Sequence, residues 1–128
     1  MCQILLSIHP EFVDKILKGE KKFEFRRVKA RQLPDRIIMY STSPVCKVIG
    51  EAEVEKIIVD KPELVWEETK NFSGINKDYY VEYYHDRTTA VAYKLKNVIK
   101  YDEPKELKDF EVKVAPQSFV YVDNYEQI

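Results

Sequence analysis

Glycine is scarce in this sequence, which has only Gly19, Gly50 and Gly74 among its 128 residues. A phosphate-binding loop or a dinucleotide-binding turn needs several glycines at short spacing, because the backbone must approach the phosphate closely. The three glycines are too far apart for either motif. A Gly-x-Ser-x-Gly nucleophile elbow is missing as well, so nothing indicates a serine hydrolase of that type.

Histidine and cysteine are equally rare, with His9, His85, Cys2 and Cys46 as the full set. Their spacing matches no zinc-ligand pattern, so we expect neither a metal nor another cofactor. Two lone cysteines outside a Cys-x-x-Cys pair favour reduced thiols, and therefore a cytoplasmic location.

Long apolar runs are missing too. No stretch approaches the ~20 apolar residues of a membrane-spanning helix, and the opening "MCQILLSIHPEF" has no basic leader, so we expect no membrane partner. Hydrophobic residues make up 45% of the chain and charged residues 34%, which is typical of an ordinary globular protein. The length predicts a single domain over residues 1–128.

Charge is present in both signs but is unevenly distributed. Residues 1–50 carry ten Lys or Arg and five Asp or Glu, whereas residues 51–128 carry eleven and seventeen. Seven of the basic residues fall between Lys21 and Arg36. Such a cluster is able to attract a phosphate backbone, although a solvated basic loop would have the same composition.

Hydrophobic periodicity predicts several strands and a few helices. Strands are expected at Cys2–Ile8, Lys21–Arg27, Arg36–Ser43, Cys46–Val59, Thr88–Tyr101 and Gln117–Val122. A helix should begin at His9–Pro10 and end at Gly19, a second should begin with a capping box of Asp60 and Glu63, and a third should be capped by Asn76. This order favours an α+β fold, in which a small mixed β-barrel is flanked by a few short helices.

The segment "KKFEFRR" alternates charged and aromatic residues. In a regular strand, Lys22, Glu24 and Arg26 would share one face, and a bulge would turn Lys21 to the same side. One interpretation is a surface ladder of ion pairs, and the other is a polar cleft for a nucleotide.

Hydroxyl groups form two further candidate sites. Tyr79, Tyr80, Tyr83 and Tyr84 recur at helical spacing, which suits base stacking but is more typical of a helix that packs on a sheet with its hydroxyls at the rim. The segment "YSTSP" from Tyr40 to Pro44 ends a strand in three hydroxyls, which would suit either a turn or the mouth of a cleft.

The segment "LLSIHPEFVDKILKGEKKFEFRR" resembles the opening of the ASCH domain (activating signal cointegrator homology), a branch of the PUA-like superfamily. The family motif Gly-x-Lys-x-x-Glu-x-Arg is complete in Gly19, Lys21, Glu24 and Arg26, and three later segments are similar to the family's later strands. The resemblance implies a PUA-like mixed β-barrel whose cleft binds RNA or a nucleotide. The implied binding residues are Lys21, Glu24, Arg26, Ser41, Thr42, Ser43, Gln117 and Ser118.

The same resemblance leaves other functions open. One branch is similar to an amidohydrolase of acetylated cytidine, in which a threonine stands where this chain has Glu24; its later glutamate could correspond to Glu67, Glu68 or Glu82. Another branch is similar to a ribonuclease. In either case Lys21 and Glu24 would be the acid/base pair, whereas a protein-interaction module would use neither. The charge distribution favours binding over catalysis. Lys21 and Arg26 would then pair with phosphate, and Glu24 would orient them or accept hydrogen bonds from a base edge or a ribose.

Overall fold

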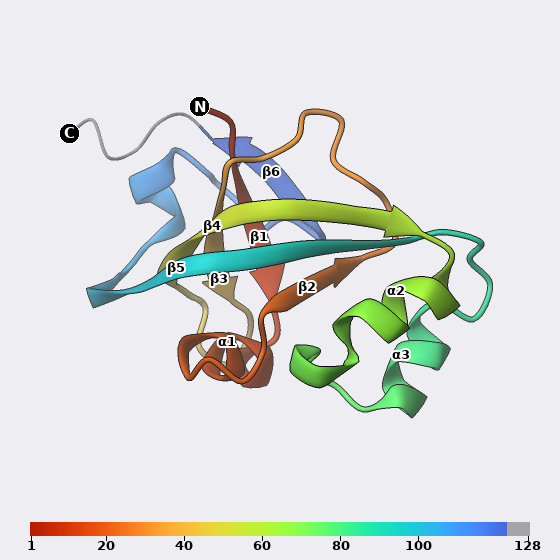
Figure 1. The fold of residues 1–128 in the computed structure, drawn as a ribbon. Helices are drawn as coiled ribbons and strands as arrows, with labels where there is room; N and C mark the ends of the chain where they lie inside the picture. The colour runs from red at the N-terminus through yellow and green to blue at the C-terminus, as the bar shows by residue number, and fades with distance from the viewer. Residues whose placement is uncertain (123–128) are drawn as a thin grey trace.

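The computed structural model describes residues 1–122, in which one six-stranded sheet is flanked by short helices (Figure 1). The strands are β1 (Gln3–Ile8), β2 (Phe23–Arg26), β3 (Arg36–Ser41), β4 (Lys47–Asp60), β5 (Ala90–Lys105) and β6 (Phe119–Val122). The helices are α1 (Pro10–Leu17), α2 (Pro62–Thr69) and α3 (Lys77–Tyr83), with 3-10 turns η1 (Lys70–Phe72) and η2 (Leu107–Phe110).

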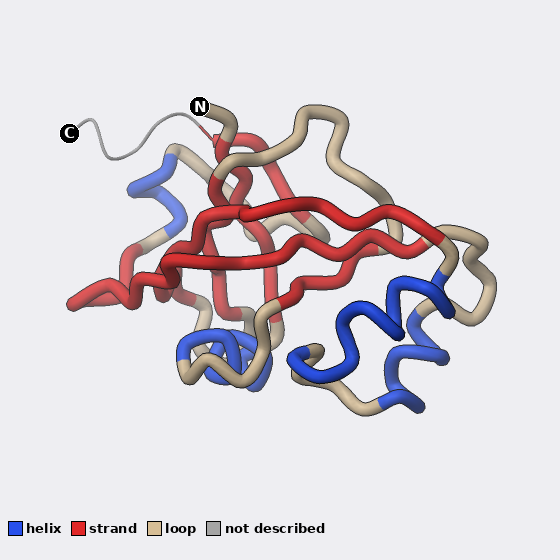
Figure 2. The backbone as a smooth tube through the Cα atoms, in the orientation of Figure 1, coloured by secondary structure: helices blue, strands red, loops and turns tan. Residues whose placement is uncertain are grey.

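The sheet is mixed and strongly curled, with the strand order β2-β5-β4-β3-β1-β6. Strands β1 and β3 are parallel, and the other neighbouring pairs are antiparallel. Figure 2 shows the long β4–β5 ribbon crossing in front of β1, β3 and β6. The edge strands β2 and β6 have no ladder between them in the part of the chain described here, so the sheet forms a half-barrel. This confirms the expected α+β fold with a curled mixed sheet and a few short helices.

Two apolar clusters fix the elements that surround the cleft. Inside the half-barrel, residues such as Ile4, Met39 and Tyr93 pack against Val13 and Ile16 of α1. On the outer side of β2 and β5, a second cluster joins the sheet to α2 and α3. Its buried members are Phe23, Phe25, Val65, Tyr80, Tyr84, Ala90 and Ala92. The alternation predicted for β2 therefore places its phenylalanines under the helices and leaves Glu24 on the opposite side.

The ends of two helices agree with the sequence prediction. Pro10 is the first residue of α1, and Gly19 adopts a φ of 80° just beyond its end. Asn76 caps α3 by accepting a hydrogen bond from the backbone N–H of Tyr79 at 2.8 Å. The expected capping box at Asp60 is wrong. Asp60 still pairs with Ala90 as the last residue of β4, so α2 begins two residues later at Pro62.

The long strands differ from the prediction at their ends. β5 continues beyond the expected end at Tyr101 to Lys105, because it stays paired with β4, and the 3-10 turn η2 follows it. β4 and β5 approach each other closely at Gly50, where a Cβ atom would lie 2.3 Å from the carbonyl oxygen of Ile99. Cys2 and Cys46 are both free thiols. Among the described residues, no helix is both long and apolar enough to cross a membrane.

Candidate nucleic-acid interface

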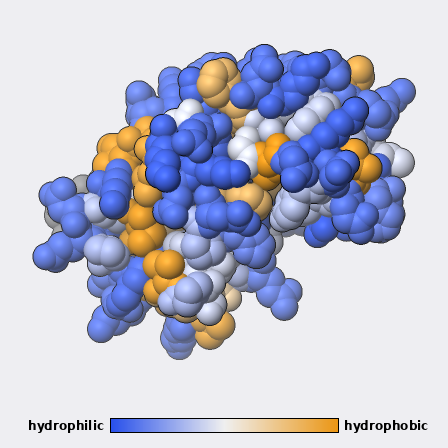
Figure 3. Space-filling view, turned by 90° about the horizontal axis from the view of Figure 1, so that it is seen from below, coloured by the Kyte–Doolittle hydropathy of each residue, from blue (hydrophilic) through white to orange (hydrophobic). Residues whose placement is uncertain are grey.

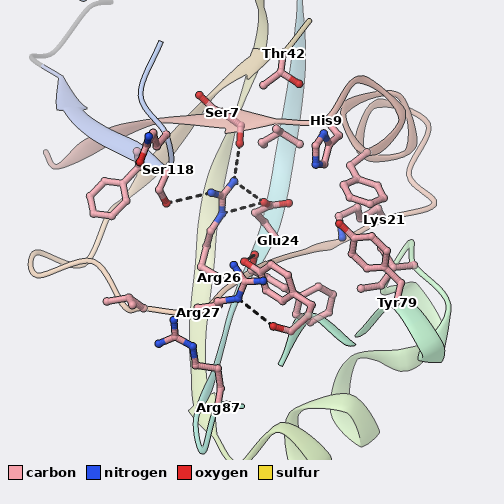
Figure 4. Close-up of a pocket in the computed structure, with 18 residues that line it drawn as sticks. Ser7, His9, Lys21, Glu24, Arg26, Arg27, Thr42, Tyr79, Arg87 and Ser118 are labelled. Atoms are coloured by element: carbon pink, nitrogen blue, oxygen red, sulfur yellow. Dashed lines mark hydrogen bonds and ion pairs between the residues drawn. The ribbon is translucent and has the colours of Figure 1, made fainter. Parts of the chain in front are cut away.

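A cleft of about 540 Å³ opens beside β2, where the half-barrel is not closed by strand pairing (Figure 4). One side is formed by the end of β1 and the start of α1, and the other by α3 and the segment before it. Its lining residues are Ser7, Ile8, His9, Phe12, Lys21, Glu24, Phe25, Arg26, Arg27, Val28, Thr42, Ile75, Tyr79, Tyr83, Arg87, Gln117, Ser118 and Phe119.

An ion pair between Glu24 and Arg26 lies at the centre of the cleft. Arg26 donates to one carboxylate oxygen of Glu24, Oε2, from Nε at 3.1 Å and from Nη2 at 2.8 Å. The side chains are only 7% and 13% exposed, respectively. The other oxygen of Glu24, Oε1, accepts no hydrogen bond from any residue between 1 and 122. One carboxylate oxygen is thus fixed, and the other remains available to a ligand.

Arg26 also connects the two sides of the opening. Its Nη2 donates to the carbonyl oxygen of Ser7 at 2.9 Å, and its Nη1 donates to the hydroxyl of Ser118 at 3.2 Å. Ser7 in turn donates its own hydroxyl to the carbonyl oxygen of Pro116 at 2.6 Å. The guanidinium therefore spans the gap between β2 and β1 that no ladder closes, and most of its N–H groups are already used.

Lys21 is almost fully buried at the inner end of the cleft, with a 2% exposed surface. Its Nζ donates to the carbonyl oxygen of Ser73 at 2.7 Å and lies 4.8 and 5.2 Å from the ring centroids of Phe25 and Phe12. Burial lowers the pKa of Lys21 to about 8, while the nearby carboxylate of Glu24 opposes the shift. Lys21 is therefore mostly cationic at neutral pH, but it loses its proton far more readily than an ordinary lysine.

The segment before α3 holds Lys21 in place. Gly74 has a φ of 72°, and a Cβ atom at this position would lie 2.5 Å from Cβ of Lys21. The carbonyl oxygen of Gly74 also accepts a hydrogen bond from Nζ of Lys15 at 3.0 Å. A turn that is distant in sequence thereby fixes both the position and the polar partner of the motif lysine.

Aromatic side chains line the wall that faces Glu24. Tyr79 and Tyr83 lie one turn apart on α3 with nearly parallel rings, 6.5 Å between centroids, and Tyr79 is 43% exposed. Phe12 meets the edge of Tyr79, and His9 meets the edge of Phe12. Burial raises the pKa values of Tyr79 and Tyr83, so both phenols are neutral near pH 7. The four tyrosines are thus divided, because Tyr80 and Tyr84 pack in the core on the other face of α3.

The structure brings most of the predicted site residues together. Lys21, Glu24, Arg26, Thr42, Gln117 and Ser118 line the cleft. Ser41 and Ser43 are not among the lining residues, although Thr42 between them is. Ser41 is buried at the end of β3, and Ser43 lies in the exposed turn that follows. Lys22, expected on the face of Glu24, points away and lies over the ring of Phe72.

Several lining residues escaped the sequence analysis as members of a site. Arg27 belonged to the basic cluster, and Tyr79 and Tyr83 to the tyrosine stripe, so a signal existed for them. His9 and Phe12 lie in the family-like opening segment but outside its Gly-x-Lys-x-x-Glu-x-Arg motif, and Arg87 lies in no motif. Only the folded chain brings the three to the cleft. Over residues 1–122, no group of three or more His, Cys, Asp and Glu residues is arranged to hold a metal ion.

The chain matches known proteins over nearly its whole length. The family model described as ASCH domain matches residues 6–117. An "ASCH domain-containing ribonuclease" of Zymomonas mobilis is 30% identical over 127 residues, which cover 94% of this chain and 84% of that protein. An ATP synthase subunit alpha and a large ribosomal subunit protein uL22 of Ureaplasma parvum are 30% and 32% identical over 120 residues. The chain spans only 15% and 39% of the lengths of these two relatives.

Solved structures agree with the sequence matches. The crystal structure of ASCH from Zymomonas mobilis superposes with a TM-score of 0.87 at 26% identity, covering 98% of this chain and 90% of the other. The N-terminal domain of Staphylothermus marinus McrB superposes with a TM-score of 0.51 at 14% identity, which shows a likeness of fold alone.

Proposed function

This chain belongs to the ASCH domain family, and we propose that it binds RNA by taking one nucleotide unit of a single strand into the cleft beside β2. The Zymomonas relative that is named a ribonuclease supports a function on RNA. The chain would act as one domain, without a cofactor, in the cytoplasm. Figure 3 shows mostly hydrophilic side chains on the face seen from below, with hydrophobic ones in limited groups, so this face does not favour a protein-interaction module.

The observation that carries the proposal is the pairing of a buried cation with an aromatic wall in one cleft. Proteins recognise single-stranded RNA by stacking splayed bases on aromatic rings and by hydrogen bonding to base edges. Tyr79 offers an exposed ring, and Lys21 and Glu24 offer a donor and an acceptor beside it. A volume of about 540 Å³ lies within the range of small-molecule sites.

Each charged residue has a separate role in this proposal. Nζ of Lys21 donates to a carbonyl or ring nitrogen of the base, or to the ribose, and the free oxygen of Glu24 accepts from an N–H or hydroxyl group. Arg26 positions Glu24, because its guanidinium is occupied by Glu24, Ser7 and Ser118. This replaces the role of phosphate ligand that the sequence implied for Arg26.

The proposal is tested by fluorescence anisotropy with a short single-stranded RNA of mixed sequence at neutral pH. Lys21→Met keeps the side-chain length but removes the charge, and we expect its affinity to fall at least tenfold. Lys100→Ala removes an exposed lysine from the distal part of β5 and serves as the control, with affinity within twofold of the parent. Equal affinities of the parent and Lys21→Met would reject the cleft as the binding site.

Cleavage of RNA is the second candidate, and the lowered pKa of Lys21 favours it. An ammonium with a pKa of about 8 is a good general acid near neutral pH. The free oxygen of Glu24 would take the proton from a ribose 2′-hydroxyl, whose oxygen would attack the adjacent phosphorus. The 5′-oxygen would leave with a proton from Lys21, giving a 2′,3′-cyclic phosphate and a 5′-hydroxyl.

The products distinguish this reaction from binding alone. Incubation of the parent with the same RNA should release fragments that end in a cyclic phosphate, and Glu24→Gln should release none. An intact RNA after prolonged incubation with the parent would leave binding as the function. Release of acetate from acetylated cytidine would instead indicate an amidohydrolase reaction, and by a different route from that of the related branch, because the carboxylate of Glu24 cannot serve as its hydroxyl nucleophile.

A further inference from the structure

We infer that the RNA strand leaves the cleft over Arg27 and Arg87 and continues into a second cavity between α2 and α3, so that the site holds successive nucleotides. This inference rests on the proposed RNA binding and extends it. It assigns a phosphodiester site at the mouth of the first cleft and a base site beyond it. The occupant is a single-stranded polynucleotide, rather than a free nucleotide.

The phosphodiester site consists of the two arginines whose guanidiniums are available. Nε of Arg27 donates to the carbonyl oxygen of Tyr83 at 3.0 Å, and the guanidinium lies 4.1 Å from the Tyr83 ring centroid. Its two Nη nitrogens have no protein acceptor among residues 1–122. Arg87 is exposed, and its nearest charged partner within the same residues is the neighbouring Asp86, with Nε 3.9 Å from Oδ1.

The two arginines lie on the same part of the cleft. Both line it, and Figure 4 shows them next to each other on the side away from Thr42. Arg27 is oriented by its stacking on Tyr83, so its remaining N–H groups are directed and need little reorganisation to bind an anion. Arg26 has only one N–H group left for this role, because the others are used by Glu24, Ser7 and Ser118.

The second cavity has a volume of about 280 Å³ and lies on the opposite face of α3. Its lining residues are Pro62, Glu63, Trp66, Glu67, Lys77, Tyr80, Val81, Tyr84, His85 and Arg87. Trp66 is half-buried beside this cavity and packs on the buried ring of Tyr80, with 4.8 Å between ring centroids. Arg87 lines both cavities, so a phosphate bound there is in reach of each.

The geometry of α3 explains how one strand can use both sites. Tyr79 and Tyr83 face the first cleft, while Tyr80 and Tyr84 face the second cavity. α3 ends at Tyr83, and the backbone N–H of Arg87 donates to the carbonyl oxygen of Tyr84 in the turn that follows. A strand that rounds this end of the helix therefore passes Arg87 on its way between the two aromatic surfaces.

Charge indicates that a base, rather than a phosphate, enters the second cavity. Glu63 and Glu67 lie on its rim and would repel a phosphate, although Glu67 is paired with Lys70 at 2.8 Å. Carboxylates are suitable acceptors for the amino groups of a base, and Trp66 supplies the ring for stacking. The positively charged Arg87 and Lys77 are then available to bind the RNA phosphates on either side of that base.

The test compares a nucleoside monophosphate, a dinucleotide and a longer single strand, all with 2′-fluoro riboses so that no 2′-hydroxyl is present to attack. We expect the parent to bind the dinucleotide more tightly than the monophosphate. Arg87→Ala should weaken dinucleotide binding several-fold and reduce the slope of log K against log salt by about 0.7. Trp66→Ala should weaken it roughly tenfold and leave the monophosphate unaffected.

Controls separate these effects from misfolding. Lys100→Ala removes a charge outside both cavities, and Phe72→Ala removes an exposed ring outside both cavities. Each variant should bind the three ligands as tightly as the parent does. Trp66 packs on Tyr80, so Lys77→Ala, at an exposed residue, provides a second variant of the same cavity. Lys77→Ala should weaken the binding of the dinucleotide and of the longer strand but not that of the monophosphate.

The outcomes are distinct. Dinucleotide affinities of Arg87→Ala, Trp66→Ala and Lys77→Ala that all equal that of the parent would overturn the inference and leave the proposed RNA binding in place. A parent that binds none of the three ligands would overturn both. Loss of monophosphate affinity in Trp66→Ala and Lys77→Ala that equals their loss of dinucleotide affinity would show a single site, which also overturns the strand path.

Discussion

Arg26 binds a single oxygen of Glu24 through two of its nitrogens, at 2.8 and 3.1 Å, while two other hydrogen bonds of the same guanidinium reach Ser7 and Ser118. The motif arginine thereby orients the motif glutamate and holds the edge strand β2 against β1 and the segment before β6. In this chain, the geometry of the cleft and the contact between β2 and β1 depend on the same side chain.

Arg26→Ala should lower the free energy of unfolding by roughly 2–4 kcal/mol, because the substitution leaves the buried carboxylate of Glu24 without its partner. Urea unfolding measures this loss. The matched control is Lys56→Ala, which removes an exposed ion pair with Glu68 and should cost less than ~1 kcal/mol.

The double variant Arg26→Ala with Glu24→Gln separates two causes. If the cost comes from an unpaired charge, the neutral amide should recover part of the stability. Equal stabilities of the single and double variants would place the cost in the lost contacts to Ser7 and Ser118 instead.

Gly74→Ala should displace Lys21 and weaken RNA binding. A Cβ atom at residue 74 would lie within 2.8 Å of Cβ, Cγ and Cδ of Lys21, and the φ of 72° adds backbone strain. Gly19→Ala is the control, since Gly19 has a φ of 80° but nothing within 4 Å of the added atom. We expect Gly19→Ala to lower the free energy of unfolding by about 1 kcal/mol and to leave the RNA affinity unchanged. Equal RNA affinities of the two variants would contradict the role of Gly74.

The sequence predicted the parts of this site that depend on local periodicity. Alternation along β2 placed Glu24 and Arg26 on one face, and the complete family motif added Lys21. The orientation of Lys21 depends on Ser73 and Gly74, which lie more than fifty residues away along the chain. No pattern in one sequence shows which distant turn supplies a carbonyl oxygen.

The same limit explains why the sequence analysis did not separate lining residues from their neighbours and missed residues from distant elements. Ser41 and Ser43 differ from Thr42 because of how the turn leaves β3, and a cluster of hydroxyls does not reveal that direction. Arg87 reaches the cleft because α3 packs on β2 through Tyr80 and Tyr84. No sequence motif around Arg87 marks it as a site residue, so only the packing of α3 shows that it lines the cleft.

Burial of Lys21 should make the stability of the protein depend on pH in alkaline solution. The lysine has a pKa of about 8 in the folded chain and an ordinary value of 10.5 in the unfolded chain. Between these values the unfolded chain binds more protons, so the stability contributed by Lys21 rises with pH, by as much as ~3 kcal/mol. Below pH 8 the full cost of the buried charge is present.

Comparison with Lys21→Met isolates this effect, because the other titrating groups are common to both proteins. The unfolding free energy of the parent minus that of the variant, measured in urea, should increase from pH 8 to pH 10.5 and stay constant from pH 6 to pH 7. A difference that does not change with pH would show that the buried lysine is not titrating in this range.

The pH dependence of RNA binding and turnover distinguishes the two proposed roles of Lys21. If the ammonium binds RNA, the affinity of the parent should fall as pH rises through about 8, and it should approach that of Lys21→Met, whose own affinity stays constant. If the ammonium also donates a proton during cleavage, the rate at saturating RNA should fall over the same range, after binding has been corrected for. The two quantities are measured on one set of samples, by anisotropy with a 2′-fluoro RNA and by product formation with the natural RNA. A constant affinity with a falling rate would assign Lys21 to catalysis alone, and a falling affinity without any product would make this chain a binding domain.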